Sequence, residues 1–154
     1  MYTTVLALHS WLRWAVVLIG VIAIVRALTA GAGRRPWLPL DDRLGLFFII
    51  ALDVQLLLGL ILYFVLSPIT QAALADLGSV MGVSSMRYWA VEHVFGMVVA
   101  VFLAHRGRAR VKAVSDPTRK HRVAAVFLIL AMIAILASIP WPGMPNARPL
   151  FRGV

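Results

Sequence analysis

The chain has 154 residues, of which 62% are hydrophobic and only 14% are charged. Soluble domains are typically about 45–50% apolar and about 25% charged, so this composition excludes an ordinary soluble protein and favours an integral membrane protein. The 15 Lys and Arg outnumber the 6 Asp and Glu, giving a net charge of +9, but they lie between apolar runs, as in loops beside a membrane, so we expect no nucleic-acid partner. Because there is no cysteine, disulfides, iron–sulfur clusters, thiolate metal sites and c-type haem attachment are excluded.

Four apolar segments are long enough, or nearly so, to cross ~30 Å of hydrocarbon as helices, which takes about 20 residues at ~1.5 Å each. They run from about 5 to 28, 44 to 66, 88 to 104 and 123 to 139, and a proline-rich tail follows at 140–154. Strand-like alternation is missing, and backbone groups in lipid need internal partners, so the segments are predicted to be helices. We therefore predict an all-α, integral membrane four-helix bundle, up-down-up-down, in which residues 1–154 form one domain.

The distribution of Lys and Arg predicts the orientation. The first and third loops, with the adjoining helix ends, carry Arg26, Arg34, Arg35, Arg43, Arg106, Arg108, Arg110, Lys112, Arg119, Lys120 and Arg122. The opposite side has only Arg87, Arg148 and Arg152. Since basic loops stay in the cytoplasm, both termini are expected on the periplasmic side of a bacterial inner membrane.

Two histidines stand out because ionisable side chains are rare inside membranes and are default functional candidates. His9 and His93 each lie about five residues into helices that enter from the same side, so both rings are expected roughly 7–8 Å below the boundary. Imidazoles at matching depth on two parallel helices can bind one haem iron from opposite faces. The alternatives are ordinary interfacial histidines that bond a neighbour or water, and a metal or quinone site.

The neighbours of His93 fit such a cofactor. Gly96 follows His93 by one helical turn and leaves space against the helix. Arg13 or Arg87 is expected to bind the haem carboxylates, and Glu92 to accept the second ring proton of a histidine on a neighbouring helix.

Two charged side chains are expected to lie near the middle of the membrane. Arg13 lies about nine residues from the outer boundary and Asp53 about ten from the inner one, on helices that a short loop makes antiparallel. Either charge alone is costly there, so an ion pair that pins the first helix to the second is predicted. A role in proton movement or in holding a haem propionate is the alternative. His105 and His121 lie in or beside the basic third loop and are expected to be solvated.

Four short motifs carry a resemblance. His9-Ser-Trp-Leu-Arg-Trp14, Gln55-Leu-Leu-Leu-Gly59, Val91-Glu-His93 and Ile139-Pro-Trp-Pro142 open or close the four helices or lie within them. Over nearly its whole length the chain resembles small bacterial four-helix membrane proteins labelled cytochrome b-like. The resemblance implies a b-type haem held by helix histidines, here His9 and His93. Well-characterised four-helix b-type cytochromes usually offer four such histidines, whereas two lie within these spans, which argues against two haems.

The expected function is that of a small b-type cytochrome-like electron carrier, with one haem b between the first and third helices. It would pass electrons between quinol, or another membrane donor, and a larger complex. The competing function is a non-catalytic accessory subunit whose helices and tail bind a larger respiratory or photosynthetic assembly. Neither is a stand-alone enzyme, and the expected partners are the lipid bilayer, other membrane subunits and, as a further candidate, a quinone.

Overall fold

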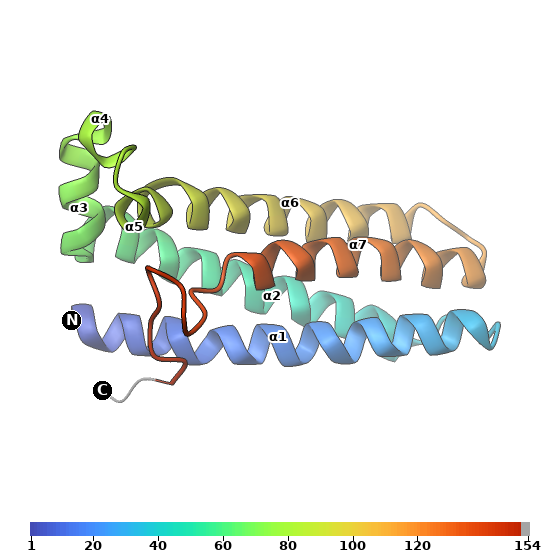
Figure 1. Ribbon diagram of the computed structural model, residues 1–154. Helices are drawn as coiled ribbons and strands as arrows, with labels where there is room; N and C mark the ends of the chain where they lie inside the picture. The colour runs from blue at the N-terminus through green and yellow to red at the C-terminus, as the bar shows by residue number, and fades with distance from the viewer. Residues whose placement is uncertain (152–154) are drawn as a thin grey trace.

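The computed structural model describes residues 1–151, which fold into four long helices lying side by side (Figure 1). These are α1 (Tyr2–Ala32), α2 (Pro39–Ile61) with the π-helical turn η1 (Leu62–Leu66), α6 (His93–Lys112) preceded by the π-helical turn η2 (Tyr88–Glu92), and α7 (Pro117–Ala137). Three short helices join η1 to η2: α3 (Pro68–Ala75), α4 (Leu77–Val80) and α5 (Ser84–Arg87). Within the described residues there is no strand, in agreement with the all-α prediction.

Four helical segments are long and apolar enough to cross a membrane, as expected for a multi-pass membrane protein. They are Tyr2–Ala32, Pro39–Leu66, Ser84–Lys112 and Pro117–Ala137. The third extends eight residues past the expected end at 104. The helix continues beyond the apolar region because each further residue still pairs its backbone N–H with a carbonyl in the preceding turn. The fourth ends at Ala137, ahead of Pro140, since a proline disfavours helical geometry in the residue before it.

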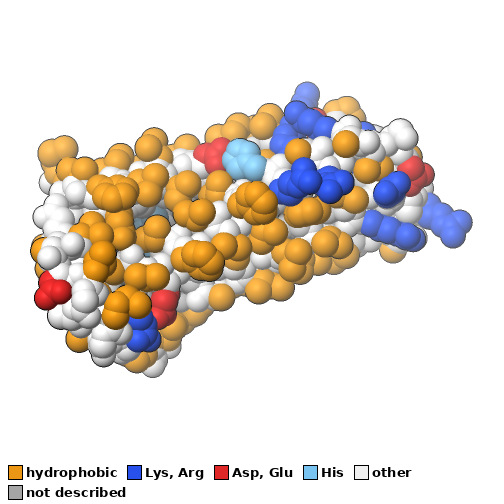
Figure 2. All heavy atoms as spheres, turned by 90° about the horizontal axis from the view of Figure 1, so that it is seen from above, with side chains coloured by type: hydrophobic (Ala, Val, Ile, Leu, Met, Phe, Trp, Pro, Cys, Tyr) orange, Lys and Arg blue, Asp and Glu red, His pale blue; other side chains and the backbone are white. Residues whose placement is uncertain are grey.

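The packing order around the bundle decides which helices face each other. α1 packs on α2 and α7, α6 packs on α7 and α2, and α1 and α6 therefore lie on the diagonal. Figure 1 shows the N-terminus, the short helices α3 to α5 and the described tail (residues 138–151) at one end, which we call the tail end. The loops after α1 and α6 lie at the opposite, basic end, where Lys and Arg side chains gather (Figure 2).

Small residues let the helices approach closely. Ala100 of α6 and Ala131 of α7 are completely buried in the core around Phe48 and Leu52. A Cβ added at Gly107 would lie 2.4 Å from the Cβ of Phe127 in α7. Lipid tails are as apolar as the side chains, so helices associate in a membrane chiefly through such close packing and through hydrogen bonds.

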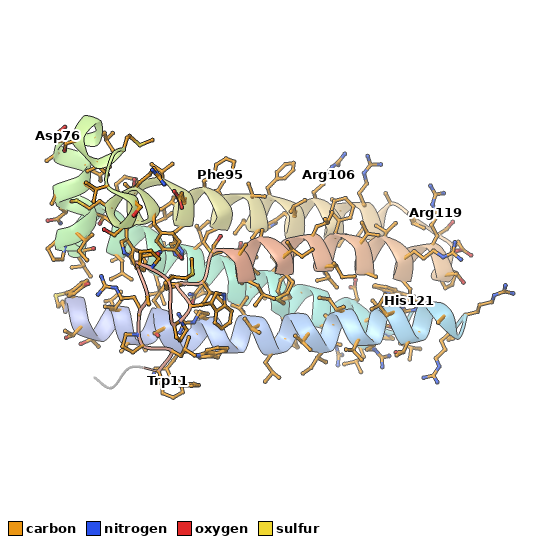
Figure 3. The ribbon with its side chains drawn as sticks, viewed as in Figure 1. Trp11, Asp76, Phe95, Arg106, Arg119 and His121 are labelled. Atoms are coloured by element: carbon orange, nitrogen blue, oxygen red, sulfur yellow. The ribbon has the colours of Figure 1, made fainter. Side chains whose placement is uncertain are left out.

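The proline-rich tail packs on its own chain. The Arg13 and Trp14 side chains both donate to the carbonyl oxygen of Leu150, at 2.6 and 3.0 Å. The ring of Phe151 stacks on Trp14 at 5.5 Å between centroids and lies 5.4 Å from Trp11, which Figure 3 shows beside the tail. In the accessory-subunit alternative the tail binds a larger complex; its residues 152–154 lie outside the described part of the chain.

We expect Gly107→Ala to destabilise the bundle by about 1–3 kcal/mol, the usual cost of overpacking. The Phe127 Cβ that the new methyl group meets is fixed to the backbone of α7, so the two helices must move apart. Thermal unfolding of the purified protein in detergent measures the loss. Gly45→Ala is the matched control, because a Cβ there meets only the end of the Arg108 side chain at 3.6 Å and raises helix propensity. Equal melting temperatures for the two variants would contradict the close α6–α7 contact.

We expect Phe151→Ala to loosen the tail, because each aromatic contact is worth about 0.5–1.5 kcal/mol beyond its buried area. Hydrogen exchange at the backbone N–H groups of Ala147 and Arg148, which donate to Met144 and Pro140, should become faster. Phe95→Ala is the control, since Phe95 is 69% exposed on the far side of the bundle from the tail. Unchanged exchange in Phe151→Ala would show that other contacts hold the tail.

Candidate functional site at the tail end

His9 of α1 and His93, the first residue of α6, face each other across the tail end of the bundle. Their ring centroids are 6.4 Å apart, and the rings are inclined at 67°. Both line one cavity of about 130 Å³. The structure thus brings together the two imidazoles that the sequence predicted at the same level. They meet because α1 and α6 lie on the diagonal and both histidine side chains point toward the centre of the bundle.

The end of α7 fixes the orientation of His93. The backbone oxygen of Ser138 accepts hydrogen bonds from His93 Nδ1 at 2.8 Å and from the Tyr88 hydroxyl at 2.6 Å. Because a carbonyl only accepts, Nδ1 carries a proton, and Nε2 is the nitrogen that remains for a ligand. Gly96 packs against Ser138, where a Cβ would collide with the Ser138 hydroxyl, so it makes room for the end of α7 and not for a cofactor. Glu92, which was expected to accept a ring proton from a histidine on a neighbouring helix, pairs with Arg87 instead.

His9 is held from the side of α2. Gln55 donates from Nε2 to the backbone oxygen of His9 at 2.9 Å. A Cβ at Gly59 would lie 3.2 Å from His9 Cε1, so the glycine lets the ring lie against α2. Among the described residues, His9 Nδ1 and Gln55 Oε1 are buried without a hydrogen-bond partner. Unsatisfied buried polar atoms are rare, and here they lie in side chains that line the cavity, where a ligand or water can reach them.

The π-helical turns shape this end of the cavity. In η1 the backbone N–H of Ser67 donates to Leu62 five residues back, and the Tyr63 hydroxyl donates to the backbone of Ala90 in η2 at 2.8 Å. Single π-helical turns shift the register of a helix and are frequent at functional sites. Tyr63 and Trp89, one from each turn, line the cavity beside the histidines.

Of the two arginines expected at the site, Arg13 lines the cavity and Arg87 does not. Arg13 lines the cavity and is hydrogen-bonded to Ser10 and Leu150. Arg87 instead pairs with Glu92 at 2.7 Å on the surface. Arg148 of the tail lies over the Trp89 ring at 5.3 Å and lines the cavity. Only the return of the tail toward α1 brings Arg148 here, and no motif in the sequence indicates that return.

Asp53 pairs with a different residue from the one expected. His105 Nε2 lies 2.9 Å from Asp53 Oδ1, whereas Arg13 contacts the tail, and no ion pair joins Arg13 to Asp53 in residues 1–151. Arg13 and Asp53 lie within about 3 Å of each other along the bundle, because Gln55 of α2 bonds to His9 of α1 and the two charged residues are four and two residues from that contact. The direction differs: Gln55 faces α1, and two residues before it Asp53 points about 200° away, toward α6.

His121 is buried and not solvated. It is completely inaccessible at the basic end, packed on Trp37 at 4.9 Å between ring centroids (Figure 3). Both of its ring nitrogens lack a hydrogen-bond partner among the described residues, and it lines a second cavity of about 50 Å³. Lys120 and Arg122 suggested a solvated segment, but in a helix they lie about 100° to either side of His121. His105, by contrast, is about half exposed, although it is bonded to Asp53.

The candidate site therefore consists of two imidazoles, two arginines, Gln55 and aromatic side chains around a largely apolar cavity. No cluster of three or more His, Cys, Asp or Glu side chains that could hold a bare metal ion occurs in residues 1–151. Two imidazoles can hold a metal only where another group, such as a porphyrin, supplies the remaining ligands. They can also form hydrogen bonds to an organic molecule in the cavity. Comparisons with protein-family models, curated proteins and solved structures found no match for this chain.

Proposed function

We propose that this chain is a b-type cytochrome-like membrane electron-transfer protein that holds one haem b between α1 and α6. The observation that supports it is the pair of imidazoles, His9 and His93, whose rings lie 6.4 Å apart across one cavity. A haem supplies four of the six ligands of its iron, so two histidines complete the set. Haem b contributes one-electron chemistry, and the protein contributes ligands, orientation and a dry environment.

The separation of the rings suits axial coordination. Metal–imidazole bonds are about 2.0–2.1 Å long, so two nitrogens on opposite sides of one metal are about 4 Å apart and their ring centres on the order of 6 Å apart. The distance between the His9 and His93 centroids, 6.4 Å, is close to that value. The Ser138 carbonyl acts on His93 as outer-sphere acceptors do on metal-bound histidines, because it fixes the tautomer and raises the basicity of Nε2.

The cavity is long enough for a haem, but side chains that line it must move to admit one. Its lining on α1 extends from Tyr2 to Val16, about 21 Å of helix, which is long enough for a porphyrin. Its volume of about 130 Å³ is near that of an engineered cavity of about 150 Å³ that holds a benzene ring. Flexible lining side chains such as Leu6, Leu56 and Met97 must therefore turn aside when a haem binds. Arg13 and Arg148 are the cations placed to bind its carboxylates.

The position of the site follows from the proposed orientation. Because basic loops are usually retained in the cytoplasm, the proposed orientation has the basic end in the cytoplasm, and both termini and the site toward the periplasm of a bacterial inner membrane. Two imidazoles leave no open position on the iron, which favours electron transfer over oxygen chemistry. The donor in this scheme is quinol or another membrane donor, and the acceptor is a larger membrane complex.

A quinone is the second candidate ligand, because a void sized for one ring lies between two imidazoles. Quinone carbonyls accept hydrogen bonds, which a protonated ring nitrogen of His9 can donate. His93 donates from Nδ1 to Ser138, so its Nε2 can accept a hydrogen bond from a quinol hydroxyl. In that case the histidines bind the head group directly and the protein carries no haem. A protein that binds neither ligand fits the non-catalytic accessory subunit instead.

Replacement of either proposed haem ligand, His9 or His93, should abolish the bis-histidine haem spectrum. The protein, purified from membranes and titrated with haemin, should give the reduced-minus-oxidised spectrum of a bis-histidine b-type haem at one haem per chain. We expect His9→Ala and His93→Ala each to lose that spectrum, because the remaining single ligand leaves a five-coordinate iron.

His105→Ala is the matched control and should keep the spectrum, since His105 lies outside the cavity. An unmodified protein that stays colourless after titration would overturn the haem proposal. Quenching of Trp89 fluorescence by a short-chain benzoquinone in that colourless protein would support the quinone. If the fluorescence is not quenched, the remaining proposal is that the chain is a non-catalytic accessory subunit.

A further inference from the structure

Asp53 and His105 form a hydrogen-bonded pair on the outer surface of the bundle. Their side chains are 45% and 52% exposed, and His105 Nε2 lies 2.9 Å from Asp53 Oδ1. Apolar side chains surround them, among them Ile50 and Leu57 of α2 and Phe102 of α6, which are 48%, 58% and 65% exposed. Figure 2 shows an imidazole beside a carboxylate, with orange side chains around them and the first Lys or Arg side chains next to the imidazole on the side of the basic end. The pair therefore faces the region that lipid would occupy.

The depth of Asp53 makes this exposure costly. Asp53 lies nine residues after Leu44, where the apolar run of α2 begins, and so about 14 Å into a hydrocarbon layer of ~30 Å. The side chain of aspartate is too short to reach the head groups, unlike the long side chains of Lys and Arg. Polar side chains at such depth almost always face other protein or a water-filled cavity.

The pair also has one unused donor and one unused acceptor. The hydrogen bond uses His105 Nε2 and Asp53 Oδ1. His105 Nδ1, which donates when protonated, and Asp53 Oδ2, which accepts, are the remaining polar atoms of the pair. Neither atom is hydrogen-bonded to another residue in the described part of the chain. Lipid tails offer them no partner.

A second copy of this chain carries the matching set. We propose that the α2–α6 face around Asp53 and His105 is a homodimer interface with a two-fold axis close to the pair. Nδ1–H of each His105 then donates to Oδ2 of the Asp53 on the other copy, which closes a ring of four hydrogen bonds. Such an interface is self-complementary, as two-fold symmetry requires, and the flanking apolar side chains of the two faces pack together. This inference does not depend on haem or quinone binding.

Cysteine cross-linking tests the interface, because the chain has no cysteine of its own. Phe102→Cys places a thiol one turn before His105, and Leu18→Cys is the matched control on α1, where Leu18 is 61% exposed. Each variant is reconstituted in liposomes at the same protein-to-lipid ratio and treated with a short bis-maleimide. We expect a product of twice the chain mass, at least about tenfold more abundant for Phe102→Cys than for Leu18→Cys.

The polar pair is then removed in the Phe102→Cys variant by Asp53→Leu and His105→Phe together. Both side chains are on the surface, so the helical circular dichroism should be unchanged while the cross-linked product falls to the level of Leu18→Cys. Equal cross-linking at the two positions, no product from Phe102→Cys, or a product that persists without the pair would each overturn the proposal. Native membranes in which Phe102→Cys links only to a different protein would overturn it as well.

Discussion

Inside lipid, a polar side chain is stable only if the protein supplies its partners, and this constraint organises the tail end of the bundle. The backbone oxygen of Ser138, freed where α7 ends, accepts from both His93 and Tyr88. These two bonds attach η2 and the start of α6 to the end of α7, and they aim the His93 ring at His9. Without an end of α7 at this level, the ring would have no reason to face the cavity.

The same constraint explains why most hydrogen bonds from side chains to the backbone at this end are made to helix ends and irregular turns. Within a regular helix each carbonyl oxygen already accepts a backbone hydrogen bond, and a side chain can add only a second one, as Gln55 does at His9. A terminus or a π-helical turn leaves carbonyls free. Tyr63 donates to Ala90 in one such turn, and the tail carbonyl of Leu150 serves Arg13 and Trp14. The cavity with its two imidazoles lies where these irregular segments meet.

Polar side chains away from the tail end also need hydrogen-bond partners, and their surroundings differ. His121 is enclosed at the basic end, with ring nitrogens that no described residue satisfies, beside a cavity large enough for water. Asp53 and His105 satisfy each other only in part and face outward. An unsatisfied group inside the protein calls for a small ligand or water, whereas one on the lipid-facing surface calls for another protein.

The sequence alone was sufficient for the helical class, the four apolar helices and the shared level of His9 and His93, because apolar length and rise per residue depend only on the chain itself. Tertiary structure decided which way each side chain points around its helix. Asp53 has the depth expected for a partner of Arg13, yet it bonds His105, and Arg148 reaches the cavity only because the tail folds back along α1. Rotation about a helix axis and the path of a proline-rich tail are set by contacts between distant segments, which spacing along a sequence does not contain.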